Sequence, residues 1–208
     1  MTKVIKKSPP VTRAQQKLAT RQRIRDAAWA LFLRDGYAAT TTKAVAAKAR
    51  VAAGTVFVHA RDKDDLLCLV MADQIFECVE QAFETLPREA GFIERILHLF
   101  RGPVTLYGQH PDVSRAFLRA LPGADGPNAQ RLGASTFAFL HRMADVIRAA
   151  AQRGEVATDI DALLAARSIF ALYFSTLNGW VLGYYPIEQV LDPLLRGSLE
   201  LLMRGLHP

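Results

Sequence analysis

Three helical segments follow one another between residues 20 and 59, and the last two are too short to be stable by themselves. The first is expected to begin near Thr20, which would be its N-cap. It has apolar residues at helical spacing and ends at a glycine: Ile24, Ala27, Ala28, Leu31, Phe32 and Gly36. A short helix is expected from about Thr41, and another from Ala53 to His59, with only a tight turn between them. Because isolated helices of this length are marginal in water, the three segments must pack together.

The charge of the chain is divided unevenly. Residues 1–65 carry 14 Lys and Arg against 5 Asp and Glu, and the remainder carries 12 against 15. All seven lysines lie at or before Lys63. Such a division indicates that the basic part meets a polyanion and that the rest has a different task. Two short helices joined by a tight turn, in a basic region, are typical of a DNA-binding helix-turn-helix unit.

Glycines and prolines divide the rest of the chain into further helices. Asp62 is expected to cap a long helix that stops before Pro87, with Asp65 at its third position as in a capping box. Its acidic stripe is interpreted as a solvated face: Asp73, Glu77, Glu80 and Glu84. Its opposite side is expected in the core: Leu69, Phe76, Val79 and Phe83. More helices are expected at about 89–107, 112–121, 128–153, 161–184 and 187–205.

One set of residues is more specific than the helix pattern: Gly36, Tyr37, Ala38, Ala39, Thr40, Thr41, Val45, Ala46, Ala49, Val51, Gly54, Thr55, Val56, Phe57, His59, Lys63, Leu66 and Leu67. This set resembles the DNA-binding domain of the TetR family of transcriptional regulators, densely over residues 20–67. The sequence departs from the family pattern at Arg50, where the turn usually has Gly, and at Ala52, where a polar cap usually opens the recognition helix. Phe57 and Ala60 replace a frequent Tyr and a frequent Phe.

The fold predicted on these grounds is all-α with about nine helices. It comprises a flexible basic arm at 1–19, a helix-turn-helix DNA-binding domain at 20–66 and a larger helical effector-binding and dimerisation domain at 67–208. A recognition helix needs short or polar side chains where base edges are within reach, and phosphate contacts set its register. The residues expected to contact DNA are Thr41, Lys43, Ala53, Gly54, Thr55, Phe57, Val58, His59 and Lys63.

So small a unit reads few base pairs, so we expect a homodimer on a palindromic operator in double-stranded DNA. The last two helices are suited to the interface, and in the family that the chain resembles they build a four-helix bundle across the dimer. The residues expected there are Leu191, Leu194, Leu195, Ser198 and Leu202. A purely intramolecular core is the alternative for these side chains.

The large domain exceeds what dimerisation needs, which suggests a pocket for a largely apolar small molecule. The candidate effector-binding residues are Phe100, Tyr107, His141, Tyr173 and Asn178. By resemblance, such a ligand would release a repressor from its operator by changing the spacing of the two DNA-binding units. Two alternatives remain: a DNA-binding dimer that senses no small molecule, and an all-α enzyme.

Several other classes of site find little support. The histidines lack metal-ligand spacing, and no phosphate-binding loop or nucleophile motif occurs, so no catalytic residue, metal or cofactor is expected. Cys68 and Cys78 are too far apart on one helix for a disulfide and are expected to be reduced thiols. Ser168–Ile187 lacks charge over 20 positions, but its Gly, Asn and Pro residues favour a buried helix over a membrane span. A cytoplasmic location is expected.

Overall fold

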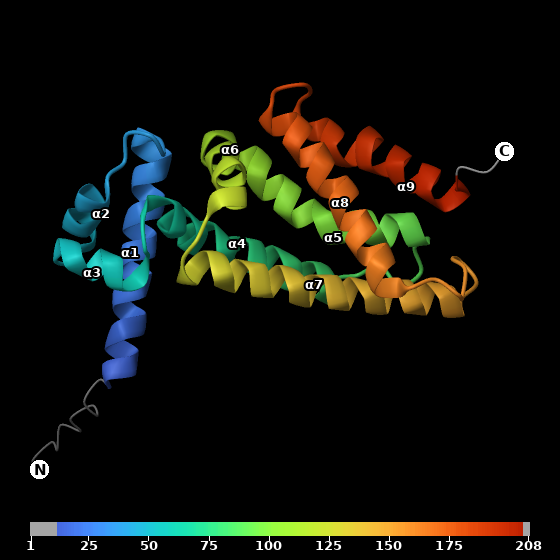
Figure 1. The fold of residues 1–208 in the computed structure, drawn as a ribbon, viewed down its shortest axis with the longest axis horizontal. Helices are drawn as coiled ribbons and strands as arrows, with labels where there is room; N and C mark the ends of the chain where they lie inside the picture. Colours follow the sequence, from blue (N-terminus) through green and yellow to red (C-terminus); the bar gives the residue numbers. More distant parts are fainter. Residues whose placement is uncertain (1–11, 206–208) are drawn as a thin grey trace, which may run out of the picture.

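The computed structural model describes residues 12–205, which form nine α-helices and no strand. The helices are α1 (Arg13–Asp35), α2 (Thr42–Ala49), α3 (Ala53–His59), α4 (Lys63–Glu84), α5 (Phe92–Gln109), α6 (Pro111–Ala120), α7 (Pro127–Gln152), α8 (Ala162–Val181) and α9 (Arg196–Arg204). Figure 1 shows α1, α2 and α3 gathered at one end of an elongated molecule, with the other helices extending away from them. The all-α prediction is confirmed.

The first helix begins earlier than the sequence analysis expected. Thr12, and not Thr20, is the N-cap, because its hydroxyl accepts from the amide of Gln15 and the Gln15 side chain accepts from the Thr12 amide. This reciprocal pair is a capping box, for which the T-x-x-Q spacing at 12–15 was the available signal. Residues 13–19 of the expected flexible arm are therefore helical and exposed, and residues 1–11 of that arm lie outside the described residues.

A small core holds α1, α2 and α3 together. Ile24, Leu31 and Phe32 of α1 are buried with Val45 of α2 and Val56 of α3. The expected bounds of the two short helices agree with the structure. Two of the four departures from the family pattern, Arg50 and Ala52, have structural consequences in the turn between α2 and α3.

The turn between α2 and α3 contains two unfavourable residues. Arg50 adopts the left-handed conformation, at φ 55° and ψ 50°, which costs a residue with a Cβ about 1 kcal/mol or more. Ala52 is the N-cap of α3 and makes no side-chain capping hydrogen bond. The recognition helix therefore depends on packing for its position.

Helices α4 and α7 run side by side through the larger part of the molecule (Figure 1). Most of the first half of α4 is buried, whereas α8 packs on α7 and α5 packs on α4. No helix within residues 12–205 is both long enough and apolar enough to cross a membrane.

Two expectations about α4 are wrong. Its acidic stripe is not simply solvated, since Asp73 pairs with arginines of α1 and α7, and Glu80 pairs with Arg142 of α7. Phe76, expected in the core, is 50% exposed. The first difference arises because α1 and α7 pack against the acidic side of α4, which the periodicity of α4 alone does not reveal.

The expected helix at 187–205 is interrupted. A 3-10 turn at Ile187–Gln189 is followed by an irregular segment in which Asp192 is extended, at φ −119° and ψ 121°. The cause is Pro193, because a residue before proline avoids the helical conformation. Regular α-helix resumes at Arg196.

Candidate DNA-binding surface and effector cavity

The exposed face of α3 carries small and apolar side chains. Ala53 and Gly54 at its start are exposed, and Phe57 and Val58 are 54% and 68% exposed. Two adjacent large apolar side chains that are exposed together on such a helix are consistent with a surface that meets a partner. Thr41 caps α2 by accepting from the Ala44 amide. With the exposed Lys43, these residues form one continuous candidate surface at the end of the molecule.

Two residues expected to contact DNA are instead engaged within the protein. His59 is only 8% exposed, and its burial, with the nearby charges of Lys17 and Arg21, lowers its pKa. The ammonium of Lys63 donates to the carbonyls of Tyr37 and Ala38, at 3.0 and 3.1 Å. It also lies 4.3 Å from the centre of the Tyr37 ring. Lys63 therefore connects the start of α4 to the turn that follows α1, a contact between residues 25 and 26 positions apart that local sequence patterns do not reveal.

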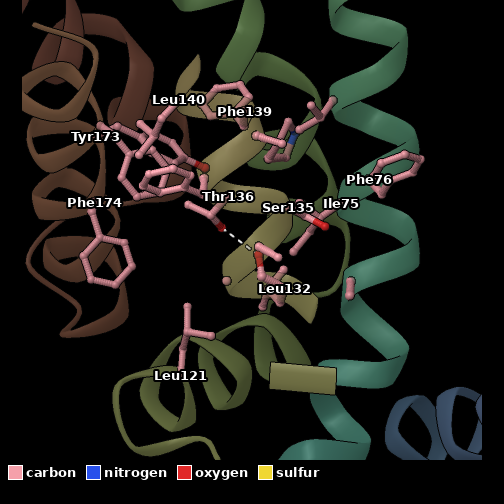
Figure 2. A pocket seen from close by; sticks show the side chains of 18 of the residues that line it. Ile75, Phe76, Leu121, Leu132, Ser135, Thr136, Phe139, Leu140, Tyr173 and Phe174 are labelled. Carbon is pink, nitrogen blue, oxygen red and sulfur yellow. Dashed lines mark hydrogen bonds between the residues drawn. The ribbon is translucent and has the colours of Figure 1, made fainter. Parts of the chain in front are cut away.

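A cavity of about 660 Å³ lies among α4, α5, α6, α7 and α8. This volume is within the range of about 300–1,000 Å³ typical of small-molecule sites. Its lining is predominantly apolar and includes Ile75, Leu99, Leu121, Leu132, Phe139 and Leu177. Figure 2 shows side chains from several of these helices around the cavity, with Thr136 bonded to the carbonyl of Leu132 within α7. Arg131 and Arg142, both partly exposed, also line it.

Three of the five candidate effector-binding residues lie at this cavity. Phe100, Tyr107 and Tyr173 line it, and the rings of Phe100 and Tyr173 stack with centroids 4.1 Å apart. Burial raises the pKa of both phenols, which are therefore neutral. The Tyr173 hydroxyl is buried and has no hydrogen-bond partner within residues 12–205.

The other two candidates are not at the cavity. His141 is exposed and packs edge-on against Phe137, with ring centroids 4.9 Å apart. Asn178 is exposed on the outer side of α8. Each was selected as a polar residue in an apolar helical face, but the faces concerned point away from the cavity.

The expected dimer-interface residues divide into two groups. Leu195 is fully buried within its own chain, and so is Leu199, which corrects the assignment of Leu195 to an intermolecular contact. Leu202 is 47% exposed, and Leu191, Leu194 and Ser198 are partly exposed. The interruption at Asp192 changes the register between the residues before and after it, so the predicted single stripe is broken.

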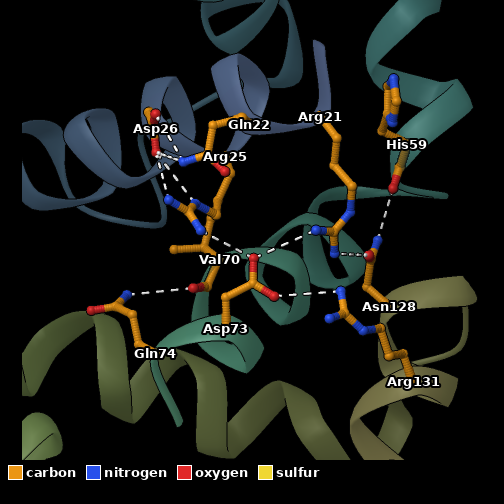
Figure 3. Close-up of polar contacts among 10 residues, drawn as sticks. All are labelled: Arg21, Gln22, Arg25, Asp26, His59, Val70, Asp73, Gln74, Asn128 and Arg131. Carbon is orange, nitrogen blue, oxygen red and sulfur yellow. Dashed lines mark hydrogen bonds and ion pairs between the residues drawn. The ribbon is translucent and has the colours of Figure 1, made fainter. Parts of the chain in front are cut away.

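Charged and polar side chains join the helix-turn-helix unit to the rest of the molecule (Figure 3). Asp73 of α4 pairs with Arg21 and Arg25 of α1 and with Arg131 of α7, at 3.5, 3.1 and 3.4 Å. Local sequence patterns give no sign of this cluster, because its members belong to three helices far apart in the chain. No group of three metal-ligating side chains occurs in the described part of the chain.

A second polar contact in the same region centres on Asp65. As expected, the Asp62 side chain accepts from the amide of Asp65 at the start of α4. The carboxylate of Asp65 does not return a bond to Asp62, however. It is fully buried and accepts from the amides of Asn128 and Ala129 at the start of α7. The expected capping box is therefore only half formed, and Asp65 caps another helix.

Comparison with known proteins agrees with this architecture. Residues 24–68 match the family described as "Bacterial regulatory proteins, tetR family". The "Fatty acid metabolism regulator protein" of Bacillus subtilis (strain 168) is 23% identical over 193 residues, which cover 93% of this chain and 98% of that protein.

Solved structures show the same fold along most of the chain. FadR of Bacillus subtilis, in complex with stearoyl-CoA, has a TM-score of 0.69 and 22% identity, covering 89% of this chain and 99% of that one. FadR of Thermus thermophilus, a TetR-family repressor in complex with lauroyl-CoA, has a TM-score of 0.72 and 24% identity, covering 90% and 95%. With the helix-turn-helix unit described above, these findings show a DNA-binding transcriptional regulator whose helix-turn-helix unit, at residues 24–68, is that of the tetR family of bacterial regulatory proteins.

Proposed function

We propose that this protein is a homodimeric repressor that binds a palindromic operator and is released by a fatty acyl-CoA. The observation that carries the effector class is the apolar cavity of about 660 Å³ in the domain attached to the helix-turn-helix unit. An acyl chain suits such a lining, since burying each methylene contributes about 0.8 kcal/mol.

The charged groups beside the cavity support a ligand with an anionic head. Arg131 and Arg142 both line it and both reach solvent, with 55% and 38% of their side chains exposed. Each is paired with a carboxylate of α4 in the structure, and a guanidinium can also form a charge-assisted, bidentate pair with a phosphate. Two relatives with this fold were solved with stearoyl-CoA and lauroyl-CoA, which supports the same class here.

The outer faces of α8 and α9 support the homodimer. Leu164 and Leu182 of the α8 region are 61% and 63% exposed, with the small residues Ala171 and Ser175 between them on the same face. On α9, Leu201, Leu202 and Met203 are more than 40% exposed. An apolar, small-residue face of this kind is covered in a symmetric dimer, which also supplies two recognition helices. A palindromic operator places their half-sites about 34–36 Å apart.

Within this proposal the exposed residues of α2 and α3 contact the operator, and Phe100, Tyr107 and Tyr173 contact the effector. Residues 20–66 serve DNA binding and residues 67–208 serve effector binding and dimerisation. The protein acts in the cytoplasm, where the operator is, and catalyses no reaction.

Fluorescence anisotropy with DNA fragments from upstream of the protein's own gene tests the proposal. One fragment should bind 10³-fold or more tightly than a scrambled duplex, with two chains per site. Lauroyl-CoA or stearoyl-CoA should then release it, whereas free CoA and laurate should not. Equal, steeply salt-dependent binding to both duplexes would contradict specific recognition.

A cavity variant separates effector binding from DNA binding. Thr136→Trp places a large ring into the cavity, and Gln130→Trp places the same ring on the exposed side of α7. We expect only Thr136→Trp to lose the response to acyl-CoA, with operator affinity kept in both. Specific DNA binding that no acyl-CoA alters would leave a dimer that senses no ligand of this class.

A further inference from the structure

The first turn of α7 is held by a side chain from the start of α4. The buried carboxylate of Asp65 accepts from the backbone amides of Asn128 at 2.9 Å and Ala129 at 3.0 Å. It also accepts from the amide of Arg61, just after α3, at 2.9 Å. One carboxylate thus satisfies amides that a helix start leaves without intrahelical partners.

The side chain of Asn128 continues this contact to the recognition helix. Its amide nitrogen donates to the backbone carbonyl of His59, the last residue of α3, at 2.8 Å, and to Asp65 at 3.0 Å. Asn128 is itself only 5% exposed. Figure 3 shows its side chain between the His59 carbonyl and Arg21, whose guanidinium lies 3.4 Å from the Asn128 amide oxygen.

The space around this contact is closed. A Cβ at Gly126 would lie 2.4 Å from Cγ of Asp65, so the chain before α7 passes directly against the carboxylate. Arg61 and Asp125 form an ion pair across the outside of the same contact. The start of α7 therefore cannot shift relative to α3 unless these bonds break or the two helices move together.

The same turn of α7 is also part of the cavity wall. Ala129 and Leu132 line the cavity, and Ala129 follows Asn128 directly. A ligand that displaces this wall acts on a helix whose second residue, Asn128, bonds to the carboxyl end of α3. Packed elements with few alternative arrangements transmit such displacements.

We propose that Asn128, together with Asp65, is a positioning residue that couples occupancy of the cavity to the orientation of the recognition helix. This inference rests on the proposed function and assigns the route of its regulation. The route involves few residues: Ala129 lines the cavity, and the side chain of the adjacent Asn128 bonds to the end of α3.

The test compares Asn128→Ala with Gln130→Ala, which removes an exposed amide side chain two residues away on α7. Operator affinity is measured with and without saturating lauroyl-CoA, and lauroyl-CoA affinity is measured without DNA. For the wild-type protein and Gln130→Ala we expect lauroyl-CoA to weaken operator binding at least about tenfold, within the usual range of allosteric coupling.

For Asn128→Ala we expect lauroyl-CoA to weaken operator binding only about threefold or less. The affinity for the operator alone and the affinity for lauroyl-CoA alone should each change by less than about threefold. If lauroyl-CoA weakens operator binding as much in Asn128→Ala as in the wild-type protein, the proposal is overturned. Loss of operator affinity without lauroyl-CoA would also overturn it, because Asn128 would then only maintain the shape of α3. If Asn128→Ala does not fold, Asn128→Ser, which leaves a smaller void, replaces it.

A second measurement does not depend on the identity of the effector. Coupling is reciprocal, so operator binding should change the hydrogen exchange of amides 128–133 in the wild-type protein and not in Asn128→Ala. If acyl-CoA has no effect on the wild-type protein but this change is present, the effector class is wrong and the coupling holds. If amides 128–133 respond equally in both proteins, the coupling is wrong.

Discussion

The carboxylate of Asp65 occupies the space that a side chain at Gly126 would need. Gly126 also has φ of 154°, a conformation that residues with a Cβ rarely adopt. We therefore expect Gly126→Ala to lower the free energy of unfolding by about 3 kcal/mol or more, from overpacking combined with backbone strain. Gly133→Ala is the matched control, since its Cβ would meet nothing within 4 Å inside α7. It should raise stability by up to about 1 kcal/mol in urea unfolding.

The left-handed conformation of Arg50 predicts a stabilising substitution. Arg50→Gly should raise the free energy of unfolding by about 0.5–1 kcal/mol, because relief of the strain exceeds the entropy that glycine adds to the unfolded chain. Lys48→Gly, inside α2, should instead lower it by about 1 kcal/mol. Chemical denaturation measures the free energy of unfolding of both variants. If both variants lose the same amount of it, Arg50 is not strained.

Lys43 and Lys63 should differ in what their removal changes. Lys43 is exposed, so Lys43→Ala should weaken binding to all duplexes and lower the salt slope by about 1. Lys63→Ala removes two hydrogen bonds and a ring contact, so it should lower stability by about 1–2 kcal/mol. Salt titrations and unfolding curves measure the two effects, and a greater change of salt slope in Lys63→Ala would contradict the assignment.

The lowered pKa of His59 predicts a loss of stability in mild acid. Burial disfavours its charged form, so the unfolded chain binds more protons as the pH falls through about 6.5, the ordinary histidine pKa. The melting temperature should therefore fall between pH 7.5 and 5.5, and this fall should be smaller in His59→Gln. Thermal unfolding of the wild-type protein and of His59→Gln across this pH range measures the difference, and identical slopes in the two proteins would refute the prediction.

The two cysteines should be poorly reactive while the protein is folded. Burial raises the pKa of Cys68 to about 12 and also raises that of the half-buried Cys78. Since the thiolate is the nucleophile, a disulfide reagent at pH 8 should react slowly with both, and most slowly with Cys68. Denaturant should make both react at the rate of a free thiol. Fast reaction of Cys68 in the native protein would contradict its burial.

The sequence predicts what is local and periodic in this protein. The bounds of α2 and α3 follow from apolar spacing and turn residues, and the missing cap at Ala52 is visible directly. Even the two errors at helix boundaries had local signals, namely the capping box at 12–15 and Pro193 within the last helical segment.

The contacts between helices could not be predicted in the same way. Asp65 stands where a helix-capping residue belongs, and nothing nearby shows that its carboxylate serves a helix 63 positions later. His141, Asn178 and Tyr173 are all polar residues within apolar helical faces of the sequence, but only Tyr173 lines the cavity. Which face of a helix meets which neighbour depends on packing that one sequence does not encode locally.

The cap that α4 supplies to α7 has a consequence for how such regulators diversify. A different effector-binding domain cannot be joined to this helix-turn-helix unit by recombination at residue 66. That junction falls inside α4 and separates Asp65 from α7, the helix that it caps. An exchange that preserves folding has to transfer position 65 together with 126–129. If the two domains were inherited separately, one would carry the carboxylate at position 65 and the other the amides at the start of α7, and the hydrogen bonds between them would not form.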